Sequence, residues 1–172
     1  MSRGALLSER GYFRGYGLQP VDDKGRVAIP AALRAILEQN TPPRADGKEQ
    51  RQVILSTHED ERCLIAYDLE TERALVEDLR QRDAVGPGGR RDYNLMRRGA
   101  GAAETLPFDA SGRFILPAFP RFHAAIEGFA FFYGAVDYFE IWDPATLLQH
   151  QSAPEVMKAA CRFLMTQRGL AA

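Results

Sequence analysis

The chain has 172 residues, of which 45% are hydrophobic and 26% charged, and its formal net charge is −1 at pH 7. These values are typical of one soluble globular domain with a sizeable core. The sequence contains no apolar run long enough for a membrane span or a secretory signal, so neither is expected. Cys63 and Cys161 form no CxxC motif, so a cytoplasmic protein without a disulfide scaffold is expected. A net charge near zero does not exclude DNA binding, since basic residues can gather on one face.

The first predicted elements are short strands at 14–21 and 26–29, on either side of the sequence Asp-Asp-Lys-Gly. Gly25 supplies the positive φ that such a turn often needs, and the Asp carboxylate can accept a nearby backbone N–H. Pro30 then suits the first position of a helix, where no N–H is required. The Pro/Gly/charge-rich stretch at 41–51 is typical of a loop.

A hairpin and a helix complete the first half. Residues 53–57 and 63–67 are rich in apolar and β-branched side chains, and they flank the charged tip 58–62. Asp68 then precedes a helical stretch at 69–82 and is expected to cap it.

The second half repeats this order of parts after a linker that Gly and Pro interrupt and that contains a short helix at 93–98. A second hairpin is expected at 128–134 and 137–142, followed by a helix at 144–150 that Asp143 caps. The expected organisation is a first half, a linker with its short helix, a second half, and a C-terminal helix and tail, at 12–84, 85–107, 108–152 and 153–172.

The two halves are copies of one sequence pattern. Residues 21–33 and 108–120 align at an offset of 87 residues, which matches Asp22 with Asp109. The hairpin ends LIAYD and FEIWD align at an offset of 75, so the first half carries 12 extra residues, which the loop accommodates. Units this small cannot bury their apolar faces alone, so the halves are expected to interleave into one barrel-like core, as a pseudo-dimer.

Each copy carries the motif Asp-x-x-Gly-Arg, in turn 1 (residues 22–26) and turn 2 (residues 109–113). Turn geometry accounts for the Asp and the Gly, but not for an arginine at the same place twice. A guanidinium fork matches guanine O6 and N7 or a phosphate, and the Asp four residues earlier could hold it by a salt bridge. The motif therefore favours two DNA-binding turns, against the alternative of two duplicated structural strands.

The basic residues around the two turns differ in number. Across 12–34 there are four bases and two acids, whereas turn 2 has Ala110 and Ser111 where turn 1 has Asp23 and Lys24. Binding by a single chain should therefore be weak, and several linked copies would compensate through effective concentration.

Enzymatic alternatives lack their motifs. The sequence HEDER at 58–62 has Arg62 where a zinc HExxH motif needs its second histidine, and GPGGRR at 86–91 lacks the ending of a phosphate loop. Cys63 lies in an apolar run, as a buried residue would. We therefore expect no enzyme, no cofactor, no metal and no small-molecule substrate. The remaining alternative is an assembly or adaptor protein whose turns serve protein contacts.

The stretch 13–34, together with FDASGRFILP and FEIWDP, resembles the MraZ family of bacterial transcriptional regulators, within the broader AbrB-like (SpoVT–AbrB) group. The resemblance runs from about residue 12 to about residue 165. It implies an α+β, mainly β fold: a double-split β-barrel of swapped hairpins with peripheral helices. It also implies ring-like homo-oligomers, association with the nucleoid, and binding to tandem short G-rich promoter boxes of cell-division and cell-wall genes, usually as a repressor.

The resemblance also assigns roles within the turns. Arg26 and Arg113 match the family's DNA-contacting position, and Lys24 lies on the same loop as Arg26. Two departures from the family pattern are an N-terminal extension at 1–11 and the long loop at 41–51. The complete set of predicted DNA-binding and turn-shaping residues is Arg26, Arg113, Lys24, Arg14 and Arg34, with Asp22, Gly25, Asp109 and Gly112 orienting them.

Overall fold

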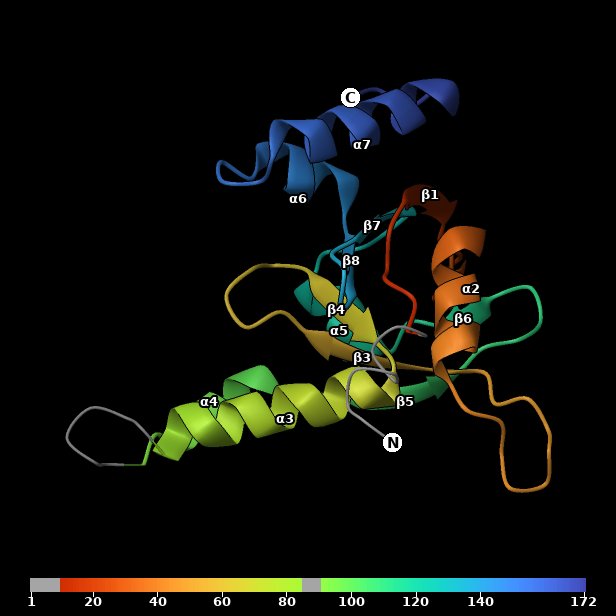
Figure 1. Ribbon diagram of the computed structural model, residues 1–172. Coiled ribbons are helices and arrows are strands. Elements are labelled where there is room, and N and C mark those ends of the chain that lie inside the picture. Colours follow the sequence, from red (N-terminus) through yellow and green to blue (C-terminus); the bar gives the residue numbers. More distant parts are fainter. Residues whose placement is uncertain (1–9, 85–90) are drawn as a thin grey trace.

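Two antiparallel sheets organise the fold in the computed structural model, which describes residues 10–84 and 91–172 (Figure 1). The strands are β1 (Tyr16–Pro20), β2 (Arg26–Ala28), β3 (Gln52–Thr57), β4 (Leu64–Tyr67), β5 (Glu104–Pro107), β6 (Arg113–Ile115), β7 (Phe129–Gly134) and β8 (Phe139–Trp142). The helices are α2 (Ala31–Asn40), α3 (Leu69–Ala84), α4 (Tyr93–Gly99), α5 (Ala118–His123), α6 (Pro144–Gln149) and α7 (Glu155–Gln167).

The strand order shows how the two halves interleave. The large sheet runs β1-β7-β8-β4-β3-β5, and the small sheet is a ribbon of β2 and β6. Strand β1 of the first half pairs with β7 of the second, and β5 pairs in the same way with β3. The expected α+β architecture and the interleaving of the halves are therefore confirmed. In the described residues the two sheets do not close into one barrel, so the double-split barrel stays a prediction.

The pairing is nearly symmetric about an axis that relates the two halves. In the small sheet Val27 lies opposite Phe114, its counterpart at the 87-residue offset. In the large sheet Ile65 lies opposite Glu140, its counterpart at the 75-residue offset. A pseudo-twofold axis therefore passes through both pairs, as the duplicated sequence leads one to expect.

The hairpins and the helix caps are confirmed. Strands β3 and β4 pair with each other, as do β7 and β8. Asp68 accepts a hydrogen bond from the backbone N–H of Thr71 at 2.9 Å, at the start of α3. Asp143 accepts one from Thr146 at 2.9 Å, at the start of α6. These local signals are reliable because a carboxylate satisfies backbone N–H groups that a helix start leaves free.

The predicted linker at 85–107 differs from the structure at its C-terminal end, where β5 forms an edge strand of the large sheet. Its register places Gln52 opposite Pro107 and Leu55 opposite Glu104. This strand was not predicted from the sequence, because only Leu106 is partly buried and no alternation of apolar residues marks it. The short helix is present as α4, capped by Asp92. Residues 85–90 of this linker, and residues 1–9 of the N-terminal extension, lie outside the described residues.

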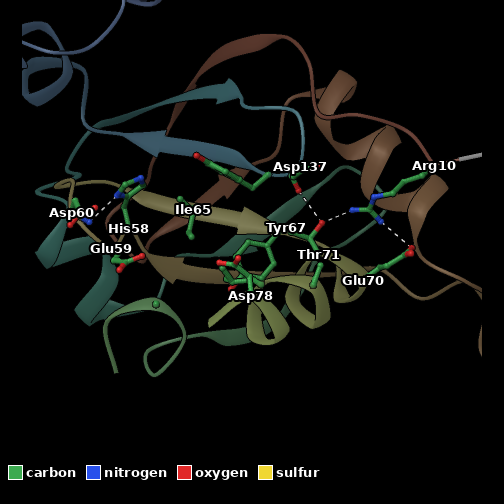
Figure 2. Close-up of a pocket in the computed structure, with 14 residues that line it drawn as sticks. Arg10, His58, Glu59, Asp60, Ile65, Tyr67, Glu70, Thr71, Asp78 and Asp137 are labelled. Carbon is green, nitrogen blue, oxygen red and sulfur yellow. Dashed lines mark hydrogen bonds and ion pairs between the residues drawn. The ribbon is translucent and has the colours of Figure 1, made fainter. Parts of the chain in front are cut away.

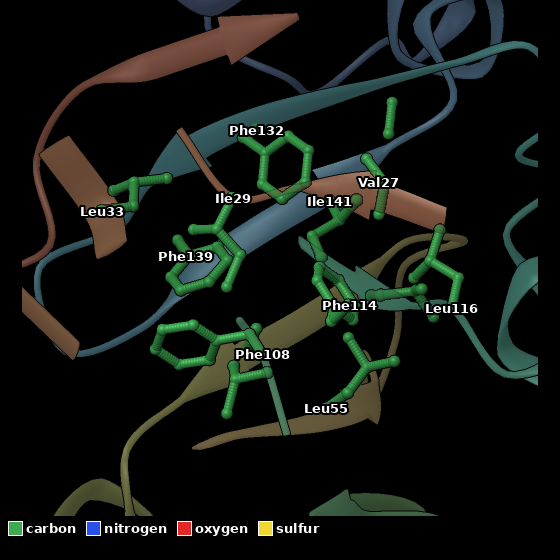
Figure 3. Close-up of a cluster of buried hydrophobic side chains, with 14 of the residues drawn as sticks. Val27, Ile29, Leu33, Leu55, Phe108, Phe114, Leu116, Phe132, Phe139 and Ile141 are labelled. Atoms are coloured by element: carbon green, nitrogen blue, oxygen red, sulfur yellow. The ribbon is translucent and has the colours of Figure 1, made fainter. Parts of the chain in front are cut away.

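The main core fills the space between the ribbon and the large sheet (Figure 3). The ribbon contributes Val27 and Phe114, which are 2% and 4% exposed, while their neighbours along each strand face outward. Burying side chains of this size stabilises a fold by about 1.5–3 kcal/mol each, which anchors the short ribbon. The large sheet and α2 supply most of the rest of the cluster: Leu33, Leu37, Val53, Leu55, Leu64, Ala66, Phe132, Phe139 and Ile141.

The outer face of the large sheet is covered by helices that lie at opposite ends of the molecule in Figure 1. Helices α6 and α7 cover one part and form a second apolar cluster there with Leu18, Phe131 and Trp142. Helices α3 and α4 contact each other at the opposite end. On turns 1 and 2, by contrast, Lys24, Arg26, Ser111 and Arg113 are exposed.

Candidate functional site

Turn 1 is held together by the carboxylate of Asp22. Its Oδ1 accepts the backbone N–H of Lys24 at 3.0 Å and of Arg26 at 2.8 Å, and its Oδ2 accepts Nε of Arg26 at 2.6 Å. Gly25 has a φ of +84°. The hydrogen bond between the two side chains lowers the pKa of Asp22 and raises the pKa of Arg26. The salt bridge predicted across this turn is therefore present.

Turn 2 has the same backbone but a different side-chain arrangement. Oδ1 of Asp109 accepts the backbone N–H of Ser111 and of Arg113, both at 2.9 Å, and Gly112 has a φ of +81°. The hydrogen bond from the Arg113 N–H lowers the pKa of Asp109. Within the described part of the chain, the Arg113 guanidinium makes no hydrogen bond or ion pair, so the salt bridge expected here is not present.

The two turns lock into each other's halves through their glycines. The carbonyl of Gly25 accepts the N–H of Leu116, and the carbonyl of Gly112 accepts the N–H of Ile29, both at 2.9 Å. A Cβ atom at Gly25 would lie 2.8 Å from the Leu116 carbonyl oxygen, and one at Gly112 would lie 3.0 Å from the Ile29 oxygen. Both positions thus require glycine for its backbone conformation and for the close approach.

The ribbon brings the two arginines onto one exposed face. Arg26 lies opposite Ile115 and Arg113 lies opposite Ala28, so all four share the face away from the core. Diagonal neighbours of this kind are separated by about 7–8 Å. A hollow of about 430 Å³ on this face is lined by both arginines and by Asp22. The arrangement presents two fork-shaped cations that can clamp phosphates or match guanine edges.

The other predicted contacts are placed differently. Lys24 is exposed on turn 1. Arg34 is half-buried over turn 2, where a Cβ at Gly112 would lie 3.0 Å from the Arg34 Cδ. Arg14 precedes β1, whose length places it about 20 Å from turn 1. Its guanidinium instead lies 5.5 Å from the centre of the Tyr12 ring. The structure therefore brings Arg34 to the paired turns and leaves Arg14 apart from them.

One residue at the turns, Arg121, was missed by the sequence analysis. Its Nη1 donates to the carbonyl of Asp23 in turn 1 at 3.4 Å, and its other donors reach Ile126 and Glu127. The signal was available, because Arg34 and Arg121 are related by the 87-residue offset. The aligned stretch ended one residue before them in both copies.

A second hollow, of about 480 Å³, lies between α3 and the outer face of the sheet, away from the ribbon (Figure 2). At its rim Arg10 donates to Asp68 at 2.8 Å and to Glu70 at 3.1 Å. Arg10 also contacts Thr71, whose hydroxyl donates to the Asp137 carbonyl at 3.0 Å. These polar groups fasten the start of α3 to the end of the N-terminal extension, which indicates a structural role.

The two cysteines, which could serve as nucleophiles, are buried. Cys63 and Cys161 are buried free thiols, and burial raises the pKa of both, that of Cys161 to about 11. Thiols in this state are poor nucleophiles. Residues 10–84 and 91–172 contain no group of three or more His, Cys, Asp or Glu that could hold a metal. No helix within these ranges is long and apolar enough to cross a membrane.

Comparison with known proteins gives matches along most of the chain. The family model described as "MraZ protein, putative antitoxin-like" matches residues 100–160. The "Transcriptional regulator MraZ" of Ruegeria pomeroyi is 37% identical over 141 residues, which cover 82% of this chain and 83% of that protein. Proteins of the same name from Ruegeria sp. and Rhodospirillum rubrum are 33% and 31% identical, over 78% and 74% of this chain and 78% and 76% of their own lengths.

Proposed function

The chain belongs to the MraZ family of transcriptional regulators, and from this premise we propose that it binds double-stranded DNA with the exposed face of the β2–β6 ribbon. The observation that carries the proposal is the diagonal pair of Arg26 and Arg113 on this face. The printed names of the matched relatives describe a transcriptional regulator, and the ribbon face of this chain carries two arginine side chains that suit an anionic partner.

The ribbon suits the dimensions of the major groove, which admits a two-stranded β-ribbon. In turn 1 Asp22 engages Nε of Arg26, which leaves both Nη groups for a bidentate contact with guanine O6 and N7. Such a contact contributes about 1–3 kcal/mol of discrimination against a wrong base. Nothing among the described residues engages the Arg113 guanidinium, and Lys24 supplies a further charge for a phosphate. Arg34 packs over turn 2 and supports it, and Arg14 would reach only more distant phosphates.

The oligomeric state and the DNA target that we propose rest on the family resemblance and on the weak DNA binding expected of a single chain. With few basic residues on the two turns of one chain, tight binding needs several copies whose turns lie along repeated sites. We therefore propose a ring-like homo-oligomer at the nucleoid in the cytoplasm. Its turns would bind tandem short G-rich boxes in the promoter of a cell-division and cell-wall gene cluster and repress it.

A second candidate, an assembly or adaptor protein that does not bind DNA, is favoured by one observation. Helix α5 exposes Phe119 and Phe122, with 62% and 79% of each residue accessible, and Ile115 on the ribbon is 59% exposed. Exposed apolar side chains in one region are typical of protein contact surfaces. Salt dependence separates the two candidates, because affinity for DNA falls steeply as salt rises.

The test is binding to the DNA upstream of this protein's own gene, measured at two salt concentrations for the wild type, Arg26→Ala and the control Arg73→Ala. Arg73 is an exposed arginine on α3, so the control removes the same charge away from the ribbon. We expect salt-sensitive binding whose tight form is lost in Arg26→Ala, a weakening of about 10- to 100-fold, and is unchanged in Arg73→Ala, with the oligomer size of each variant unaltered. No binding at low salt by folded wild-type oligomer would overturn the proposal in favour of the adaptor.

A further inference from the structure

Each turn is covered by an arginine that comes from the other half of the chain. Arg121, in the second half, lies against turn 1, and Arg34, in the first half, lies against turn 2. Both are half-buried, and they are counterparts in the repeat. Arg34 and Arg121 lie against the turns, whereas Arg26 and Arg113 point outward from the ribbon.

The guanidinium of Arg121 is engaged by carbonyl groups on three sides. Its Nε donates to Ile126 at 3.1 Å, its Nη2 to Glu127 at 3.2 Å, and its Nη1 to Asp23 at 3.4 Å. A side chain fixed in this way is not free to turn toward a phosphate. It instead links the loop after α5 to the backbone of turn 1.

The same loop supports the base of turn 1 by a second route. The N–H of Val21 donates to the carbonyl of Gly128 at 2.9 Å, directly before turn 1 begins. A Cβ at Gly25 would lie 3.7 Å from the Arg121 Nη1, so the guanidinium also lies close to Gly25. The loop and the guanidinium therefore contact the backbone around turn 1 at Val21, Asp23 and Gly25, directly before Arg26.

We propose that Arg121 is a positioning residue for turn 1, which sets the orientation of Arg26 without touching DNA itself. The inference rests on the proposed function, since it concerns the same DNA-binding face. Arg34 plays the corresponding part at turn 2 by packing alone. Within the described residues it makes no hydrogen bond, and its Nη1 would lie 3.1 Å from a Cβ at Gly112.

The first test separates positioning from direct contact by salt dependence. A residue that contacts a phosphate contributes about 0.9 to the slope of log affinity against log salt, whereas a positioning residue contributes nothing. We expect Arg121→Gln to weaken DNA binding about 10-fold with an unchanged slope. Lys24→Ala should reduce the slope by about 0.9. A slope change in Arg121→Gln, or an affinity equal to that of the wild type, would overturn the inference.

The second test asks which turn Arg121 acts through. Substitutions that work through a shared element are not additive, and independent ones are. We expect the effect of Arg121→Gln to vanish in an Arg26→Ala background at low salt and to persist in an Arg113→Ala background. Equal effects in both backgrounds would indicate general damage to the fold and would count against the proposal. Arg121→Lys, which keeps the positive charge and one donor nitrogen, should show an intermediate affinity. It replaces Arg121→Gln if that variant does not fold.

A third measurement does not depend on DNA. Hydrogen exchange of the free protein should be faster in Arg121→Gln for a peptide that covers turn 1, and unchanged for one that covers turn 2, with Arg73→Gln as the control. Exchange equal to that of the wild type at turn 1 would refute the positioning role even if DNA binding holds. Conversely, if Arg121→Gln exchanges faster at turn 1 but the wild type binds no DNA, the result would support the contact of Arg121 with turn 1 and refute only the proposed function.

Discussion

Turn 1 and turn 2 share a backbone and differ in the chemistry they present. In both, an aspartate accepts the N–H groups two and four residues later, and a glycine has a φ near +80°. Only in turn 1 does the aspartate also hold the arginine side chain, and only turn 1 has a lysine. The scaffold of a turn is therefore separable from its charge, and the two copies allow each to be tested against the other.

The supports beneath the turns differ in the same direction. Arg121 donates a hydrogen bond to turn 1, whereas Arg34 lies over turn 2 without one among the described residues. Turn 1 is thus the more ordered site with an oriented arginine, and turn 2 has a freer one. Ordered contacts lose less conformational entropy on binding, so turn 1 should contribute more to specific DNA affinity.

The largest effect is expected where the scaffold itself is broken. Gly25→Ala places a Cβ 2.8 Å from the Leu116 carbonyl oxygen at a φ of +84°, so it should lower the free energy of unfolding by more than the about 1–2 kcal/mol that the backbone conformation alone costs. Gly47→Ala is the control, because it has a φ of +76° and open space around its Cβ. Urea unfolding measures both, and equal losses would show that the contact between the halves is not tight.

The next effect compares the two arginines. Arg26→Ala should weaken specific DNA binding by about 10- to 100-fold, which corresponds to the loss of one bidentate contact. Arg113→Ala should weaken it less, by about 3- to 10-fold, because no described residue holds its guanidinium in place before binding. Fluorescence anisotropy with a labelled promoter fragment measures both. A larger loss for Arg113→Ala would reverse the ranking of the turns, and no loss would assign turn 2 to assembly.

A gain of charge should make turn 2 resemble turn 1. Ser111 occupies the position of Lys24, and it is exposed. Ser111→Lys should strengthen binding about 2- to 5-fold at low salt. It should also steepen the slope of log affinity against log salt by about 0.9, because the new lysine adds one phosphate contact. Ser111→Gln adds length without charge and should do neither. An unchanged salt slope in the lysine variant would place turn 2 away from the DNA backbone.

The smallest expected effect is on the pH dependence of stability. The pKa of Asp22 and that of Asp109 are both lowered from 3.8, so their stabilisation is complete above that value and is lost as the pH falls through the lowered pKa. Asp22 has the additional partner Arg26, so Asp22→Asn should remove more of the acid sensitivity than Asp109→Asn. Urea unfolding between pH 5 and pH 2 tests this, and identical curves would show that the ion pair contributes nothing.

Sequence analysis predicted the parts that depend on neighbouring residues. The turns, the two hairpins and the caps Asp68 and Asp143 are set by local hydrogen bonds and apolar patterns, and the duplication indicated that the halves interleave. It missed β5, because that strand owes its conformation to pairing with β3 and carries one partly buried apolar residue.

The candidate site followed the same rule. The position of Arg26 beside Asp22 is a property of five consecutive residues and was predicted. The separation of Arg14 from the turns depends on the length of β1, and the bracing by Arg121 depends on contacts between halves. The distance between two residues in the fold does not follow from their separation in the sequence. Counting basic residues along 12–34 therefore placed Arg14 with turn 1, although the length of β1 separates them.

The exchange of strands between the halves also has a consequence for how the chain is made. Tyr16 in β1 lies opposite Tyr133 in β7, so the strand formed first during synthesis waits for one of the last. Pairings of such long sequence separation close slowly, and an unpaired edge strand can join a wrong partner in the interval. The nascent first half on the ribosome is therefore an incomplete sheet, and the β2–β6 ribbon can pair only after β6, which ends at Ile115 of the 172 residues, has emerged.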